Sequence, residues 1–168
     1  MNWDAIKAIV LDIDGILTDG KIGYCGSTEV KFFHVRDGHG LKLAMRAGIK
    51  VGILSGRSSE ANRTRAAELG LDFLYEGKKD KREAFRILLE EQNLKAEECL
   101  YMGDDVVDIP VLVQSGVAVT VADAPEIMDK YADFRTALPG GGGAVREVVE
   151  RLLKEQNKWN GLMERYIS

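Results

Sequence analysis

Short, continuous apolar runs recur along this chain of 168 residues, and they constrain its fold more than any other feature. Each run is too short to be a typical helix and is rich in branched residues, as in strands buried on both faces of a parallel sheet. The runs cover residues 8–11, 51–54, 99–102 and 117–121, with a shorter strand expected at 73–75. They predict a parallel sheet at the centre of the molecule.

Amphipathic helical patterns separate these runs. We expect helices over about 59–69 and 81–92, and another from about residue 144, where apolar side chains recur along one stripe. Alternation of strands and helices favours right-handed crossovers and a doubly wound, Rossmann-like α/β sheet. Because a chain of this length fits one compact unit, we expect residues 1–168 to form a single domain.

One segment interrupts the alternation after the first strand. Residues 21–35 contain two strand-like pieces around Gly26 and Ser27, which predicts an inserted β-hairpin. Adjacent aromatic residues, Phe32 and Phe33, cannot both face one core across an alternating strand. Residues 37–40, Asp-Gly-His-Gly, are interpreted as a turn that leads into a helix near Leu41.

Composition excludes several classes of partner. The net charge is −4 and no basic tract occurs, so we expect no binding to nucleic acid or to an anionic membrane. No apolar run approaches the roughly 20 residues that span a bilayer, and the N-terminus lacks the pattern of a signal peptide. We therefore expect a cytoplasmic protein. Cys25 and Cys99 have no metal-ligand spacing, and Cys99 is expected in the core.

Acidic side chains follow two of the expected strands. Asp12 and Asp14 end the first strand, and alternation directs them to the same side. Asp104, Asp105 and Asp108 follow the strand at 99–102. In an open α/β sheet, ligands bind beyond the carboxyl ends of the strands, where these groups meet. Clustered carboxylates there predict a hard cation with oxygen ligands, and Mg²⁺ fits best.

Two further strand ends carry groups that bind phosphate. Ser55 and Arg57 follow the strand at 51–54, and Lys78, Lys79 and Lys81 follow the strand at 73–75. Each signal alone is weak, because serines are common in turns and lysines are usually solvated. Together with the acidic clusters, they provide a nucleophile, a proton carrier, a metal site and cations for phosphoryl transfer.

Other motifs fail on inspection. An EF-hand loop starting at Asp12 would need glycine and glutamate where Leu17 and Gly23 stand. The glycines at 140–143 are not followed by Lys-Ser/Thr, which excludes a P-loop. His34 and His39 lack a second ligand at helical spacing and are interpreted as structural or rim residues.

Four elements together resemble the haloacid dehalogenase-like phosphatase superfamily. They are Asp12-x-Asp14-Gly15-x-x-Thr18, then Ser55, then Lys81, then Gly103-Asp104-Asp105-x-x-Asp108. The resemblance implies that Asp12 is the nucleophile and forms an aspartyl-phosphate, while Asp14 is the general acid and base. Chemistry assigns the same roles. By the same resemblance, Asp12, the backbone carbonyl of Asp14 and Asp104 hold Mg²⁺. Ser55 and Lys81 bind phosphate, and Asp105 and Asp108 are auxiliary anchors.

Further stretches, at 31–38, 54–57, 121–125 and 140–147, resemble a branch of this family without a cap domain. The branch acts on an eight-carbon sugar acid phosphate in lipopolysaccharide precursor synthesis. The resemblance to this branch implies a homotetramer. In it, the hairpin (residues 21–35) and the C-terminal tail (residues 159–168) of one subunit complete the active sites of its neighbours. A lysine expected within 140–143 is absent.

Arg57, Lys78 and Thr18 are the candidate substrate-binding residues, with Arg57 and Lys78 expected to meet a substrate carboxylate. Two alternatives remain open. One is a phosphatase for another phosphate monoester, such as a nine-carbon sugar acid phosphate. The other is a phospho-acceptor receiver or a catalytically silent regulatory domain. A receiver accepts phosphate on a mid-chain strand, which the order of acids in this chain does not match.

Overall fold

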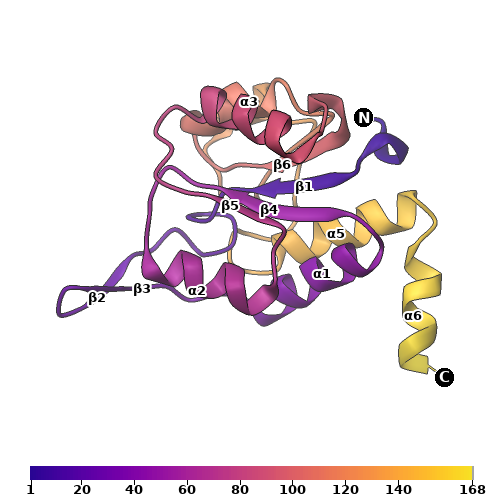
Figure 1. The fold of residues 1–168 in the computed structure, drawn as a ribbon, viewed down its shortest axis with the longest axis horizontal. Helices are drawn as coiled ribbons and strands as arrows, with labels where there is room; N and C mark the ends of the chain where they lie inside the picture. The colour runs from indigo at the N-terminus through magenta and orange to yellow at the C-terminus, as the bar shows by residue number, and fades with distance from the viewer. Residues whose placement is uncertain (168) are drawn as a thin grey trace.

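A parallel six-stranded sheet forms the centre of the computed structural model, which describes residues 1–167 (Figure 1). The order across the sheet is β5-β4-β1-β6-β7-β8. The strands are β1 (Ala8–Leu11), β4 (Lys50–Leu54), β5 (Phe73–Tyr75), β6 (Cys99–Met102), β7 (Val117–Thr120) and β8 (Phe134–Arg135). The chain winds outward from β1 in one direction and then from β6 in the other. The carboxyl ends of β1 and β6 therefore meet at the switch point where such sheets bind ligands, and the predicted doubly wound sheet is confirmed.

Helices cover both faces of the sheet, with α3 on one side and α1 and α5 on the other (Figure 1). Side chains alternate along β1, so Ile9 and Leu11 join one core cluster while Ala8 and Val10 join a second. The first cluster includes side chains of α1, α2 and α5, and the second includes side chains of α3 and α4. The helices are α1 (Val35–Arg46), α2 (Glu60–Leu69), α3 (Lys81–Gln92), α4 (Ile109–Leu112), α5 (Ala144–Glu155) and α6 (Trp159–Ile167).

Local signals explain where α2 and α3 begin and end. The Ser59 side chain accepts a hydrogen bond from the backbone N–H of Asn62 at the start of α2. Asp80 caps α3 in the same way, and Asn93 ends it in the left-handed conformation. The cap at Asp80 begins the helix at Lys81, which directs this lysine from the first turn toward the ends of the strands.

Helix α1 begins at Val35, so the predicted turn at 37–40 is wrong. Both glycines of this segment lie inside the helix, at positions where side chains of α2 and α5 approach its backbone closely. A Cβ on Gly38 would lie 2.4 Å from the guanidinium of Arg65, and one on Gly40 would lie 3.0 Å from Arg146. Asp37 accepts a hydrogen bond from the backbone N–H of Arg146 on α5 at 2.8 Å. Packing against α2 and α5 thus outweighs the turn preference of Asp-Gly.

A hairpin formed by β2 (Gly23–Cys25) and β3 (Thr28–Val30) projects from the body of the molecule (Figure 1). Its paired part is narrower than the predicted 21–35. The two aromatics that follow it differ, as alternation required: Phe33 packs against the core beneath Arg65, and Phe32 is 84% exposed. Cys25 is exposed on the hairpin, whereas Cys99 is buried.

The C-terminal segment, expected as a tail, forms helix α6 on the side of the molecule away from the hairpin (Figure 1). Its Trp159 ring packs against Arg146 and Lys154, and its Tyr166 hydroxyl accepts a hydrogen bond from Arg46 at 2.8 Å. The final residue of the expected tail, Ser168, lies outside the described residues. Within residues 1–167, no helix is long and apolar enough to cross a membrane.

Candidate active site

A cavity of about 460 Å³ opens beyond the carboxyl ends of the central strands. It is built from loops that follow β1, β4, β5 and β6, as the positions of the polar residues in the sequence predicted. Its lining residues are Asp12, Asp14, Gly20, Ser55, Gly56, Arg57, Lys79, Lys81, Asp104, Asp105 and Val107. Residues from four parts of the sequence therefore share one site.

Asp12 lies at the end of β1 and is only 7% exposed. Its Oδ1 accepts a hydrogen bond from the N–H of Ile13 at 2.8 Å, and its Oδ2 lies 2.8 Å from Nζ of Lys81. Burial raises the pKa of Asp12 to about 6, because it outweighs the attraction of Lys81, and the negative charge of Asp108 adds to the rise. The carboxylate is thus oriented and is ionised above this pKa.

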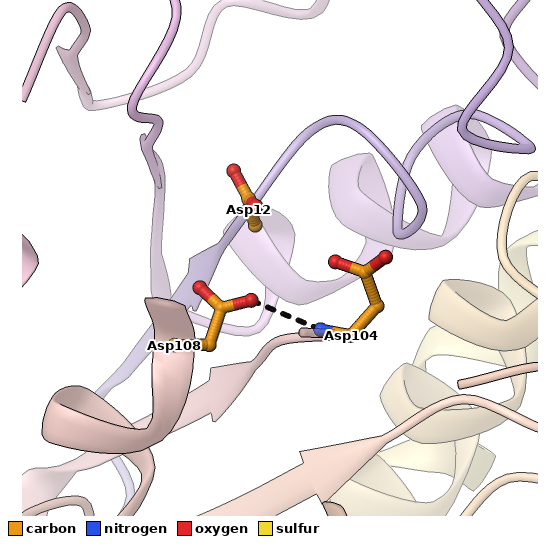
Figure 2. Close-up of side chains that lie close together, drawn as sticks. All are labelled: Asp12, Asp104 and Asp108. Carbon is orange, nitrogen blue, oxygen red and sulfur yellow. Dashed lines mark hydrogen bonds between the residues drawn. The ribbon is translucent and has the colours of Figure 1, made fainter. Parts of the chain in front are cut away.

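The loop after β6 brings Asp104 and Asp108 to the same place (Figure 2). Asp108 is fully buried and accepts from four donors: Nζ of Lys81 and the hydroxyl of Tyr101, both at 2.6 Å, and the N–H groups of Asp104 and Asp105 at 3.0 and 3.3 Å. These contacts use both of its oxygens. Asp108 is therefore arranged to hold Lys81 and the loop, and it has little capacity left for a metal ion.

Asp104 is the half-buried member of the acidic cluster. Burial, followed by the charges of Asp108 and Asp12, raises the pKa of Asp104 to about 7. Its carboxylate lies against Gly15, where a Cβ would come within 1.9 Å of Oδ2. Gly15 also has φ of +84°, a conformation that favours glycine. The glycine of the first acidic motif thus makes room for the carboxylate of the second.

Two groups complete the floor of the cavity. The Lys81 side chain is 2% exposed and lies between Asp12 and Asp108. Burial alone would lower the pKa of Lys81, but the two carboxylates outweigh it and raise that pKa. Ser55 is held by its N–H, which donates to the carbonyl of Tyr75 at 2.8 Å, and its Oγ accepts from the N–H of Arg57 at 3.3 Å. Each is fixed before any ligand binds.

Asp14 lies at the hairpin side of the cavity. Its Oδ1 is 2.7 Å from Nζ of Lys31, and its Oδ2 is 3.6 Å from Nε of Arg57. Glu29 lies 2.6 Å from the Arg57 guanidinium and 3.4 Å from Lys31. Glu29 on the hairpin and Lys31 directly after it are thus two of these three charged groups around Asp14.

Three residues predicted at the site do not line the cavity, and one of them is the fully buried Asp108. Thr18 is buried, and its hydroxyl accepts from Gly20 at 3.2 Å within the loop after β1. Lys78 is exposed, whereas Lys79 lines the cavity in its place. The sequence predicted three lysines near the site and did not single out Lys79. The turn before α3 decides which of these side chains points into the cavity, and the sequence does not determine that turn.

The glycine run lies outside the cavity lining and packs beneath it. A Cβ on Gly140 would lie 1.7 Å from the carbonyl oxygen of Gly15, and the N–H of Gly141 donates to the carbonyl of Ile16 at 2.9 Å. The run therefore supports the loop that carries Asp12 and Asp14. His34 and His39 are likewise absent from the lining residues.

Comparison with known proteins identifies the family. A model of haloacid dehalogenase-like hydrolases matches residues 34–116. The 3-deoxy-D-manno-octulosonate 8-phosphate phosphatase of Escherichia coli strain K12 is 43% identical over 155 residues, which cover 91% of this chain and 82% of the relative. The chain belongs to the haloacid dehalogenase-like hydrolase family.

Solved structures agree with this family assignment. The 3-deoxy-D-manno-octulosonate 8-phosphate phosphatase of Moraxella catarrhalis, in complex with magnesium, phosphate and KDO, superposes with a TM-score of 0.94. It is 37% identical, and the match covers 98% of this chain and 95% of that one. A cobalt-bound phosphatase from Haemophilus influenzae is 40% identical, with a TM-score of 0.90 and coverage of 94% and 92%.

The acidic cluster of this hydrolase fits Mg²⁺. Asp12, Asp104 and Asp108 each offer an oxygen within 4.8 Å of the others (Figure 2). The buried Lys81 pairs with two of these carboxylates, Asp12 and Asp108. Burial is the main cause of the raised pKa values of Asp12 and Asp104, and the negative charge of neighbouring carboxylates adds to the rise. A hard divalent cation with oxygen ligands would offset this negative charge.

Proposed function

We propose that this chain is a Mg²⁺-dependent phosphomonoesterase that hydrolyses 3-deoxy-D-manno-octulosonate 8-phosphate to the sugar acid and phosphate. One observation carries the proposal: a buried, ionisable Asp12 lies at the switch point of the sheet between Lys81 and an acidic cluster. Relatives at 43% and 37% identity that bear the name of this activity support the choice of substrate.

In the first step, an oxygen of Asp12 attacks phosphorus and the bond from phosphorus to the sugar oxygen breaks. Asp14 donates a proton to that departing oxygen, so that a neutral alcohol leaves. The result is an acyl phosphate on Asp12, which conserves the phosphoryl group. The hydrogen bond from Ile13 and the ion pair with Lys81 fix the carboxylate for this attack.

In the second step, Asp14 removes a proton from water and the resulting oxygen attacks phosphorus. The bond from phosphorus to Asp12 breaks, which releases inorganic phosphate and restores both carboxyl groups to their starting states. Lys81 and the hydroxyl of Ser55 stabilise negative charge on the transferring group. Asp108 acts through Lys81, which it holds at 2.6 Å.

Asp12, Asp104 and the backbone carbonyl of Asp14 would hold Mg²⁺, with Asp105 and Asp108 as auxiliary anchors. The ion would neutralise phosphate charge and help orient the phosphate in the cavity. Asp105 is exposed and its side chain accepts from the N–H of Val106 at 2.7 Å. That contact suits a role in shaping the loop.

Arg57 is the group we propose for the substrate carboxylate. Its side chain is 48% exposed and lines the cavity, beside Lys79. The guanidinium is paired with Glu29, so a carboxylate ligand would exchange with or join that pair. Lys79 replaces Lys78 as the second candidate because only Lys79 lines the cavity.

Phosphate release from a panel of substrates tests the proposal. The panel contains the eight-carbon sugar acid phosphate, a nine-carbon sugar acid phosphate, neutral hexose phosphates and p-nitrophenyl phosphate, each with Mg²⁺. We expect the highest kcat/KM for the eight-carbon compound. A higher value for the nine-carbon compound would reassign the substrate, and no release from any compound would refute the phosphatase function.

We further propose a single domain without a cap that assembles as a homotetramer. Phe32 and Tyr24 are 84% and 68% exposed near and on the hairpin, which supports packing between hairpins. Helix α6 lies far from the hairpin of its own chain, so this tail is available to a neighbouring site (Figure 1). The cytoplasmic location expected from the sequence remains a prediction.

A further inference from the structure

A buried lysine connects the hairpin to the active site. Lys31 directly follows β3, and its side chain is completely shielded from solvent. Lysine is almost never fully buried unless it is paired, because removing an ammonium group from water is costly. The partners of Lys31 therefore indicate why it is there.

Nζ of Lys31 lies 2.7 Å from Oδ1 of Asp14 and 3.4 Å from Oε1 of Glu29. These two contacts are ion pairs whose angles depart from hydrogen-bond geometry, since both oxygens are buried without a hydrogen-bond partner. Nζ does form a hydrogen bond with Oδ1 of Asn62, at 2.9 Å. The ammonium group is thus anchored on one side and faces the Asp14 carboxylate on the other.

The anchor is itself fixed. Asn62 is fully buried in α2, its N–H donates to the Ser59 cap, and its side-chain Nδ2 donates to the carbonyl of Arg57 at 3.3 Å. That last bond directs Oδ1 of Asn62 toward Lys31. The same segment of chain carries the Arg57 side chain to the other oxygen of Asp14, at 3.6 Å.

We propose that Lys31 is a positioning residue for Asp14, whose Oδ1 it holds from the hairpin side of the cavity. The proposal rests on the proposed function, because it takes Asp14 as the group that protonates the departing oxygen. Each carboxylate oxygen of Asp14 faces one cation, so loss of Lys31 leaves Arg57 as the only cation on this carboxylate among residues 1–167. Asp14 then rotates toward Arg57, and proton donation to the departing oxygen weakens.

Leaving-group dependence of the rate separates positioning from a structural role. An alkyl phosphate needs a proton on its departing oxygen, whereas p-nitrophenolate leaves without one. The value of kcat/KM covers only the steps up to formation of the acyl phosphate. The ratio of kcat/KM for the two substrates is therefore independent of how fast that acyl phosphate is hydrolysed. We would measure this ratio for wild type, Lys31→Met, Lys31→Arg and Lys21→Met, with a neutral hexose phosphate and p-nitrophenyl phosphate, neither of which carries the carboxylate proposed to bind Arg57.

Lys31→Met should lower kcat/KM for the sugar phosphate by about 10- to 100-fold, part of what a general acid contributes. It should lower kcat/KM for p-nitrophenyl phosphate by less than about 3-fold, and Lys31→Arg should recover part of the loss. Lys21→Met is the matched control, because Lys21 precedes the hairpin with a side chain that is 88% exposed. That variant should behave as wild type.

An equal loss on both substrates, or no loss on either, would overturn the proposal. If Lys31→Met does not fold, Asn62→Ala provides the test instead. This variant removes the side-chain oxygen that accepts the hydrogen bond from Nζ of Lys31. It should change the ratio of kcat/KM in the same direction by a smaller factor. An unchanged ratio in folded Asn62→Ala then counts against Lys31. Failure of the proposed function is distinguishable, because wild type itself would release no phosphate.

Discussion

Asp12→Asn should abolish phosphate release in the presence of Mg²⁺, and in metal-free protein it should raise the free energy of unfolding at pH 8. Activity is lost because an amide oxygen cannot serve as the nucleophile. Stability rises because the variant no longer has to hold a buried negative charge beside two other carboxylates. Asp108 remains to pair with Lys81 at 2.6 Å, so the variant leaves no buried cation unpaired.

The size of the gain follows from the pKa of Asp12, which is raised from 3.8 to about 6, mainly by burial. Each pKa unit corresponds to about 1.4 kcal/mol, which gives about 3 kcal/mol as an order of magnitude. The folded protein holds this proton more tightly than the unfolded chain does. The stability that Asp12 confers is therefore present below about pH 3.8 and is lost as the pH rises through about 6.

Asparagine carries no charge at any of these pH values, so the two proteins should differ little near pH 4 and by about 3 kcal/mol at pH 8. Urea unfolding followed by circular dichroism, after treatment with chelator and at one protein concentration, measures this difference. Asp19→Asn is the matched control, because Asp19 is exposed on the same loop and should show no such gain. Added Mg²⁺ should stabilise wild type more than Asp12→Asn, since a ligand of the folded state raises stability.

Two results would refute this reasoning. A stability difference that is the same at pH 4.5 and pH 8 would show that the charge of Asp12 is not its source. Phosphate release by purified Asp12→Asn at the wild-type rate would remove Asp12 from the chemistry, whatever its effect on folding.

Three other outcomes are expected. Chelator should abolish activity and Mg²⁺ should restore it, while Ca²⁺ substitutes poorly because of its larger and looser coordination sphere; full activity in excess chelator contradicts this. Arg57→Ala should raise KM about 10-fold or more for a sugar acid phosphate but little for p-nitrophenyl phosphate, so equal effects in steady-state kinetics would assign Arg57 to the phosphate or the fold. Deletion of 159–168 should leave a tetramer by light scattering but change KM or product release, and a fully active wild-type monomer would contradict the proposed assembly.

The sheet and the placement of its acids were predictable because each depends on local sequence and one topological rule. A buried apolar strand that ends in Asp12, and another that ends before Asp104, must bring these acids together if both strands are parallel neighbours. The observed cluster follows directly, with Asp12, Asp104 and Asp108 offering oxygens within 4.8 Å of one another.

Features that depend on contacts between distant segments were not predictable in this way. The segment at 37–40, expected to be a turn, is helical because α1 packs closely on α5, where a Cβ on Gly40 would lie 3.0 Å from Arg146. This packing leaves no periodic signal in the sequence. The last segment is different, because its residues Trp159, Leu162, Met163 and Tyr166 recur at helical spacing and could have predicted α6, whose Trp159 and Tyr166 contact α5 and α1.

Lys31 was missed although a signal existed. Glu29, Lys31 and Phe33 are two residues apart, so an extended chain places them on one face, and the partial burial of Phe33 marks that face as the inner one. A lysine between a buried aromatic and an acid on an inward face needs a carboxylate partner. Sequence alone could not identify Asp14 as that partner, since the path of the hairpin decides it.

The two halves of the site depend on different parts of the fold. Asp12, Asp104 and Asp108 follow central strands whose residues are buried throughout, so the nucleophile and the acidic cluster are tied to the most stable part of the molecule. Asp14 depends in addition on a two-stranded hairpin whose β2 strand is exposed throughout, and such ribbons are marginally stable alone. Contacts that hold the hairpin, including those proposed between subunits, therefore act on proton transfer through Lys31 and leave the acidic cluster in place.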